Sequence, residues 1–215
     1  GGAKMKFRAN VDAIRTLKTL EAEKRPATAE EKEILSKYVG WGALAKAFDK
    51  NDEKWAAEYK ELSELLTPQE YAQARSTVND AFYTSPTVID GIYEALGNFG
   101  FDGGAVLEPA MGIGNFFGRM PEAMQSHSQL YGVEIDSLSG RIAQALYPDA
   151  DIAIQGFEQN RFQNDCFDVA IGNVPFGELS FREENPIKVH PNIIYSTFCG
   201  SRMFLFSVSP LSRNL

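Results

Sequence analysis

The feature that most constrains the fold is a regular alternation of short apolar runs and helix patterns between residues 85 and 171. The apolar runs cover residues 105–107, 130–133, 151–154 and 167–171, and each has the length and composition of a buried strand. Helix patterns begin at Ser85-Pro86, near Phe116 and at about residue 137. Strands that alternate with helices in this way predict a parallel, doubly wound α/β sheet.

Helix patterns alone precede this alternation, from about residue 10 to residue 81. Two capping boxes mark helix starts there: Thr28 with Glu31, and Thr67 with Glu70. The helix that begins at Thr28 should continue through Tyr38 and be broken by Gly40-Trp41-Gly42. We expect Trp41 and Trp55 to be packing residues. We therefore expect an N-terminal helical region, residues 1–81, and an α/β domain, residues 82–215, whose pattern is truncated or atypical after about residue 180.

Composition narrows the class of partner. The 215-residue chain carries a formal net charge of −8, which argues against a nucleic-acid binder that is basic over its whole surface. Several basic residues gather near the N-terminus, where a solvated helix face explains them: Lys4, Lys6, Arg8, Arg15, Lys18, Lys24 and Arg25. Two distant cysteines and two distant histidines predict neither a disulfide framework nor a metal site. We expect a cytoplasmic protein without a membrane segment.

Three motifs fall at the carboxyl ends of the predicted strands, where ligands bind in such sheets. In "LEPAMGIGNFFG", Gly112 and Gly114 allow a tight turn before a helix. In "YGVEID", Glu134 ends the next strand, about 20 residues further on, where a carboxylate can accept hydrogen bonds from ribose hydroxyls. Taken alone, the glycine motif is equally explained as an ordinary strand–helix turn, and Glu134 as an exposed acid at a strand end. Together they predict a cofactor that contains adenosine.

The residues between the strand and the glycines indicate which cofactor. Glu108-Pro109 places an anion at the glycine turn. A carboxylate there would repel the pyrophosphate of a dinucleotide, and it would attract the ammonium group of S-adenosylmethionine. The sequence therefore favours S-adenosylmethionine.

The third motif, "GNVPFG", follows the fourth strand. Asn173 offers a side-chain carbonyl, Pro175 restricts the backbone so that the Val174 carbonyl can be a second acceptor, and Phe176 offers a flat face. This set suits a planar group with an exocyclic amine, such as adenine or a carboxamide. A proline turn closed by a core phenylalanine is the alternative.

The order "YTSP", "LEPAMGIGNFFG", "YGVEID", "GNVPFG" resembles the amino-group DNA methyltransferases that make N6-methyladenine. More narrowly, residues 7–177 are similar to the methylase region of helicase–methylase proteins of conjugative mobile elements. The resemblance implies a Rossmann-like methyltransferase sheet that uses S-adenosylmethionine. It implies these cofactor contacts: Thr84, Glu108, Pro109, Ala110, Gly112, Gly114, Glu134, Ile135, Phe157 and Glu158. Glu158 is the weakest of them, because Gly156 stands where relatives carry an acid.

The implied activity is methyl transfer to the N6 amino group of adenine in DNA, with the base flipped out and held by Asn173, Val174, Pro175 and Phe176. Val174 replaces the first proline of the common Asn-Pro-Pro-Phe pattern, which a backbone acceptor tolerates. We expect no metal and no target-recognition domain, so that helicase or recognition regions of a longer protein would choose the DNA site. Two alternatives are a protein-glutamine methyltransferase and a non-catalytic module that binds the cofactor or counters restriction.

Overall fold

A parallel four-stranded sheet forms the centre of the α/β part of the molecule. In this computed structural model, which describes residues 2–42, 44–79, 84–162 and 166–173, the strands are β1 (Ala105–Glu108), β2 (Gln129–Glu134), β3 (Asp151–Ile154) and β4 (Val169–Ala170). Their spatial order is β3-β2-β1-β4, and all three pairings are parallel. The predicted parallel α/β sheet is confirmed. Val174, Pro175, Phe176 and the tail predicted to be atypical lie outside the described residues.

Helices follow the strands as the alternation predicts. They are α5 (Pro86–Asn98), α6 (Asn115–Arg119), α7 (Glu122–Gln125) and α8 (Ser137–Leu146), with a short 3-10 helix, η4 (Phe157–Gln159), after β3. Successive strand residues point to opposite faces. Val106 and Val169 join a large apolar cluster with side chains of α5, α6 and α8. Leu107 and Ala170 join a smaller cluster on the other face, to which no α-helix in the described part contributes.

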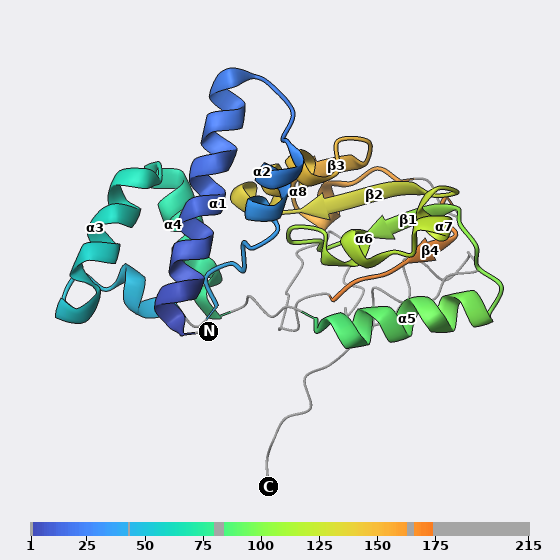
Figure 1. Ribbon diagram of the computed structural model, residues 1–215, viewed down its shortest axis with the longest axis horizontal. Helices are drawn as coiled ribbons and strands as arrows, with labels where there is room; N and C mark the ends of the chain where they lie inside the picture. The colour runs from blue at the N-terminus through green and yellow to red at the C-terminus, as the bar shows by residue number, and fades with distance from the viewer. Residues whose placement is uncertain (1, 43, 80–83, 163–165, 174–215) are drawn as a thin grey trace, which may run out of the picture.

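The N-terminal region is helical, as predicted, and Figure 1 shows it grouped on one side of the molecule with the sheet on the other. Its helices are α1 (Ala3–Glu23), α2 (Ala29–Leu35), α3 (Ala56–Leu65) and α4 (Pro68–Ser76), with 3-10 helices η1 (Ala45–Phe48), η2 (Glu53–Trp55) and η3 (Thr77–Asn79). Trp41 and Trp55 are buried and make edge contacts with Phe7, so their predicted packing role is confirmed. Among the described residues, no helix is long and apolar enough to span a membrane.

Both predicted capping boxes are present. Thr28 and Glu31 exchange bonds at the start of α2, and Thr67 and Glu70 do so at the start of α4. The prediction that the α2 helix continues through Tyr38 was wrong, since it ends at Leu35. The buried Asn10 side chain explains the early end, because it accepts from the Val39 amide at 2.8 Å and donates to the Gly40 carbonyl at 2.5 Å. These bonds hold residues 39 and 40 in a turn.

The basic residues of α1 are largely neutralised by acids of the same region. Arg8 and Arg15 both contact Glu61, at 2.8 Å each. Lys4 pairs with Glu58 at 2.6 Å and lies over the Trp55 ring. These groups are therefore paired inside the helical region, and their side chains remain about half exposed, as on the predicted solvated helix face.

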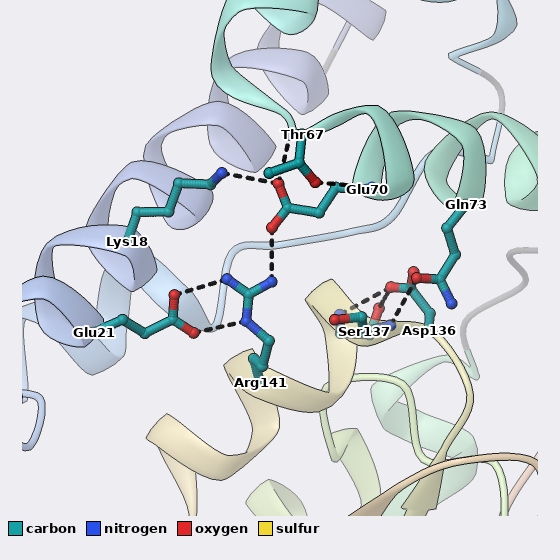
Figure 2. Close-up of polar contacts among 9 residues, drawn as sticks. Lys18, Glu21, Thr67, Glu70, Gln73, Asp136, Ser137 and Arg141 are labelled. Carbon is teal, nitrogen blue, oxygen red and sulfur yellow. Dashed lines mark hydrogen bonds and ion pairs between the residues drawn. The ribbon is translucent and has the colours of Figure 1, made fainter.

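The helical region is joined to the sheet through α8. Leu138, Ile142 and Leu146 of α8 belong to the same buried cluster as the core of α1 and α2. Beside this apolar contact, Arg141 bonds both oxygens of Glu21, at 2.6 and 2.7 Å, and one oxygen of Glu70, at 2.7 Å (Figure 2). The other Glu70 oxygen accepts from Lys18 at 2.8 Å. One apolar core and one ionic cluster thus hold the two parts together.

Glu70 is the centre of that cluster. Burial by itself would raise the pKa of Glu70, but its hydrogen bonds with Arg141 and Lys18 outweigh burial and lower the pKa to about 2. A carboxyl group whose pKa is lowered by folding stabilises the fold at pH values above its ordinary pKa, which is 4.5 here. This stabilisation is lost as the pH falls toward the pKa of the folded state.

We predict that Arg141→Met lowers the free energy of unfolding by about 2 kcal/mol at pH 7, because it removes charged hydrogen bonds and leaves Glu70 buried with one cation fewer. The difference from the unmodified chain should shrink as the pH falls from 4.5 toward 2. Urea unfolding at several pH values measures both effects. Lys37→Met, which breaks only the exposed pair of Lys37 and Glu33, is the control and should cost less than about 0.5 kcal/mol. Equal effects of the two changes would contradict the prediction.

Candidate functional site

A glycine turn connects the end of β1 to α6. Gly112 and Gly114 adopt the positive φ values of 57° and 83° that the predicted tight turn requires. The Met111 amide donates to the Val133 carbonyl at 3.1 Å, which draws the turn against the end of β2. A Cβ on Gly114 would lie 2.5 Å from Cε2 of Tyr147, and the Tyr147 hydroxyl donates to the Gly114 carbonyl at 2.8 Å. Backbone conformation and close packing both therefore require glycine at position 114.

Glu134, at the end of β2, is bound to the backbone on both sides of it. One carboxyl oxygen accepts from the Gly112 amide at 2.6 Å, and the other accepts from the Asp136 amide at 2.7 Å. Burial raises the pKa of Glu134, and the two backbone amides oppose the rise. Asp136 in turn caps α8 by accepting from the Ser139 amide at 2.8 Å. The carboxyl predicted to hold ribose thus also shapes the glycine turn and the turn after β2.

Glu108, at the end of β1, is a buried carboxyl that lacks a counterion among the described residues. Its Oε2 atom is buried, and no described residue forms a hydrogen bond with it. Burial raises the pKa of Glu108 well above its ordinary value, the nearby Glu134 raises it further, and the backbone amides of Phe117 and Phe116 oppose the rise. A buried acid with an unpaired oxygen is costly unless a ligand supplies a donor. A cationic donor such as an ammonium group would satisfy both the hydrogen bond and the charge.

Thr84 also carries an unpaired polar atom. Its Oγ1 is buried and without a hydrogen-bond partner among the described residues. Thr84 directly precedes Ser85, the N-cap residue of α5. The same helix carries Tyr93, and the pKa of Tyr93 is raised by burial and, to a smaller extent, by the charge of Glu108. Two of the residues expected to face the amino-acid end of the cofactor, Thr84 and Glu108, therefore carry oxygens without a hydrogen-bond partner among the described residues.

Asn173 lies beside the end of β1. Leu107 pairs with Ala170, and the Ile171 amide donates to the Leu107 carbonyl at 2.8 Å. Gly172 then lies against the Glu108-Pro109 turn, because a Cβ built on it would be 3.4 Å from Cδ of Pro109 and 3.7 Å from Cγ of Glu108. Asn173 follows Gly172 directly and is half-buried. The parallel register thus brings the Asn173 backbone to the same edge as Glu108 and Glu134.

The other predicted contacts are distributed around this edge. Pro109 is buried and Ala110 half-buried in the glycine turn. Ile135, an apolar residue directly after Glu134, is 67% exposed. Phe157 is half-buried against the smaller apolar cluster, and Glu158 is exposed in η4. The structure therefore gathers Glu108, Glu134 and Asn173 at one edge, and it leaves the Glu158 side chain in solvent.

Sequence reasoning missed three side chains that support the edge. Tyr147 and Tyr93 donate to carbonyls of the glycine turn and α6, Tyr93 to Phe116 at 2.8 Å. Gln73 of α4 bonds to the turn after β2 through both atoms of its amide. All three contacts join residues that are distant in the chain, so no local pattern announces them. Asp136 is different, because an aspartate directly before the 137–146 helix pattern is a recognisable cap.

Comparisons with known proteins give a partial relationship. No family model matches the chain. The Defense against restriction protein B of Escherichia phage P1 is 39% identical over 98 residues, which are 45% of this chain and 4% of the phage protein. This chain is thus similar to the phage protein in part, and the match covers a small fraction of that protein's length.

Two solved structures share a distant likeness. One is a Listeria monocytogenes protein assigned to the class I S-adenosylmethionine-dependent methyltransferases, at 16% identity and a TM-score of 0.37, over 81% of this chain and 59% of that one. The other is the methyltransferase subunit of a type I restriction-modification system from Streptococcus thermophilus, at 12% identity and a TM-score of 0.37, over 81% of this chain and 57% of that one. At these scores the likeness supports no conclusion about function.

We predict that Gly114→Ala destabilises the chain by about 2 kcal/mol or more, because it combines an unfavourable positive φ with a clash against Tyr147. Gly91→Ala is the matched control. Gly91 lies inside α5, and a Cβ at that position would have nothing within 4 Å, so alanine there should stabilise by up to about 1 kcal/mol. Thermal and urea unfolding measure both variants, and a neutral Gly114→Ala would show that the turn is not constrained as described.

Proposed function

We propose that residues 82–215 form an S-adenosylmethionine-dependent methyltransferase domain that acts on the N6 amino group of adenine in DNA, and that residues 1–81 form its helical support. The observation that carries the proposal is the buried, unpaired Glu108 Oε2 at the edge that Glu134 and Asn173 also reach. This edge lacks a cation among its described residues, and the proposed cofactor carries one. The motif order of the sequence supports the same choice.

The proposed roles follow from these positions. Glu108 would bind the ammonium group of the cofactor, with the Thr84 hydroxyl beside the same amino-acid end. Glu134 keeps the glycine turn in place through the Gly112 amide and has remaining lone pairs for ribose hydroxyls. Ile135 would cover one face of the cofactor's adenine. The methionine part of the cofactor would be lined by Pro109, Ala110, Gly112 and Gly114. Phe157 would pack beside the site, and Glu158 would contact the cofactor from the solvent side.

Asn173 and its neighbours would hold the reacting amine. When bound, the cofactor supplies a methyl group that is already activated for transfer by its sulfonium charge. The chain's task is therefore mainly orientation. The Asn173 side-chain carbonyl and the Val174 backbone carbonyl would accept the two amine hydrogens, Pro175 would restrict the turn, and Phe176 would stack on the flipped base. The amine nitrogen would form a bond to the methyl carbon as the carbon–sulfur bond breaks, and the proton that becomes acidic on the methylated nitrogen would then pass to water, so no general base is needed before attack.

A second candidate function is suggested by the phage relative, whose name refers to defence against restriction. In that case the domain would bind the cofactor and act within a restriction-related assembly without methyl transfer by this chain alone. The match covers 4% of the phage protein, so helicase or recognition regions of a longer protein are proposed partners under both candidates. Cofactor binding without methylation of any DNA would favour the second candidate.

We predict that Asn173→Ala lowers the rate of N6-methyladenine formation by about 100-fold or more, the loss expected when one preorganised hydrogen-bonding group at a reacting centre is removed. The affinity for S-adenosylmethionine should change by less than about threefold, because Asn173 is assigned to the amine and not to the cofactor. Nucleoside analysis of treated DNA and a calorimetric titration give the two readouts. Equal losses in both would contradict the assigned role.

We predict a pH-dependent cofactor affinity that depends on Glu108. Because burial raises the pKa of Glu108 and the ammonium group requires the ionised acid, binding should release a proton and weaken as the pH falls from neutrality toward 4.5, the ordinary glutamate value. Glu108→Gln should weaken binding by about 10- to 100-fold at pH 7 and remove most of this pH dependence. Titrations in buffers of different ionisation enthalpy measure the released proton. A Glu108→Gln chain that keeps the full pH dependence would refute the assignment.

A further inference from the structure

The turn after β2 is held in place by a residue of the helical region. Gln73 on α4 donates from Nε2 to the Ile135 carbonyl at 2.7 Å, and its Oε1 accepts from the Ser137 amide at 3.2 Å. Figure 2 shows Gln73 next to Asp136 and Ser137, between α4 and the start of α8. One side chain therefore holds the backbone on both sides of Asp136.

The chemistry of the amide suits this contact. The turn presents a carbonyl at residue 135 and an N–H group at residue 137, so the partner must supply a donor and an acceptor together. A carboxylate would supply acceptors alone, and a lysine or arginine would supply donors alone. A glutamine at position 73 satisfies both groups with one planar side chain.

The helix that carries Gln73 is itself fixed to α8. Glu70 precedes Gln73 by three residues and lies on the same side of α4, and Arg141 follows Ser137 by four residues on α8. Glu70 bonds Arg141 at 2.7 Å, and Gln73 bonds Ser137 at 3.2 Å. Two contacts one turn apart on each helix thus set the position of α4 along α8. A shift of α4 would break a partly buried charge cluster as well as the Gln73 bonds.

The turn that Gln73 holds is the one assigned to the adenosine half of the cofactor. Glu134 is buried, whereas the next side chain, Ile135, is 67% exposed and has no cover in the described part of the chain. We propose that Gln73 is a positioning residue: it holds the Ile135 backbone so that Glu134 meets the ribose and Ile135 meets the adenine. This inference rests on the proposed cofactor site. It gives the helical region a part in cofactor affinity that acts through the turn after β2.

Gln73→Met tests the inference, because methionine keeps the length of the side chain and its helix propensity but removes both hydrogen bonds. Gln69→Met is the matched control, since Gln69 lies in the first turn of the same helix with an exposed side chain. We expect Gln73→Met to weaken binding of S-adenosylmethionine about tenfold, the effect of one or two hydrogen bonds. Gln69→Met should stay within about twofold of the unmodified chain.

A second ligand separates positioning from a general loss of structure. 5′-Methylthioadenosine contains the adenosine half of the cofactor and lacks the amino-acid half. Gln73→Met should weaken both ligands by the same factor, whereas Glu108→Gln should weaken S-adenosylmethionine and spare 5′-methylthioadenosine. Hydrogen exchange at the Ser137 amide should also speed up in Gln73→Met. Gln73→Leu, which also removes both hydrogen bonds with an apolar side chain of similar size, provides a second variant with the same expected loss if Gln73→Met does not fold.

The outcomes distinguish this inference from the function on which it rests. An unmodified chain that binds neither ligand would overturn the proposed cofactor site and the role of Gln73 together. An unmodified chain that binds S-adenosylmethionine, with Gln73→Met and Gln69→Met both matching it, would overturn the role of Gln73 alone.

Discussion

The edge of the sheet at which the strands end depends on one buried side chain, that of Glu134. Its two oxygens accept the Gly112 amide from the turn after β1 and the Asp136 amide from the turn after β2. Two connections that are separated in the chain are therefore held by one side chain. Because β1 and β2 are adjacent and parallel, this bridge ties together the two turns that follow them. Without it the glycine turn and the start of α8 would lose their common anchor.

The buried carboxyl group of Glu108, at the same edge, destabilises the free chain and would suit a cationic ligand. An unpaired buried oxygen costs free energy in the free protein, and the neighbouring Glu134 adds to that cost. A cationic ligand that binds only the folded chain offsets the cost, and it stabilises the fold by mass action as well. Under the proposed function, the ligand would therefore offset a cost that the acidic edge imposes on the free chain.

Much of the fold could be predicted because its signals are local. Strand 151–154 and the capping boxes at Thr28 and Thr67 depend on residues within a few positions of one another, and the structure confirms them. The end of α2 was predicted wrongly because Asn10, from another helix, determines the turn at residues 39 and 40.

The placement of three candidate site residues could be predicted from local signals as well. Glu108 and Glu134 each end a strand and Asn173 follows one, so the parallel topology alone places them at one edge. Gln73 could not be predicted, since its partners lie 62 and 64 residues away and depend on how α4 packs on α8. The roles assigned to Val174, Pro175 and Phe176 remain predictions from the sequence, since these residues lie outside the described part of the chain.

The apolar cluster that α8 shares with α1 and α2 has a consequence for inheritance. A genetic exchange that moved the sheet into another protein with its own preceding helices would expose Leu138 and Ile142 to water or place them against mismatched side chains. Recombination breakpoints between the two parts should therefore be selected against, and the helices should travel with the sheet as one inherited block.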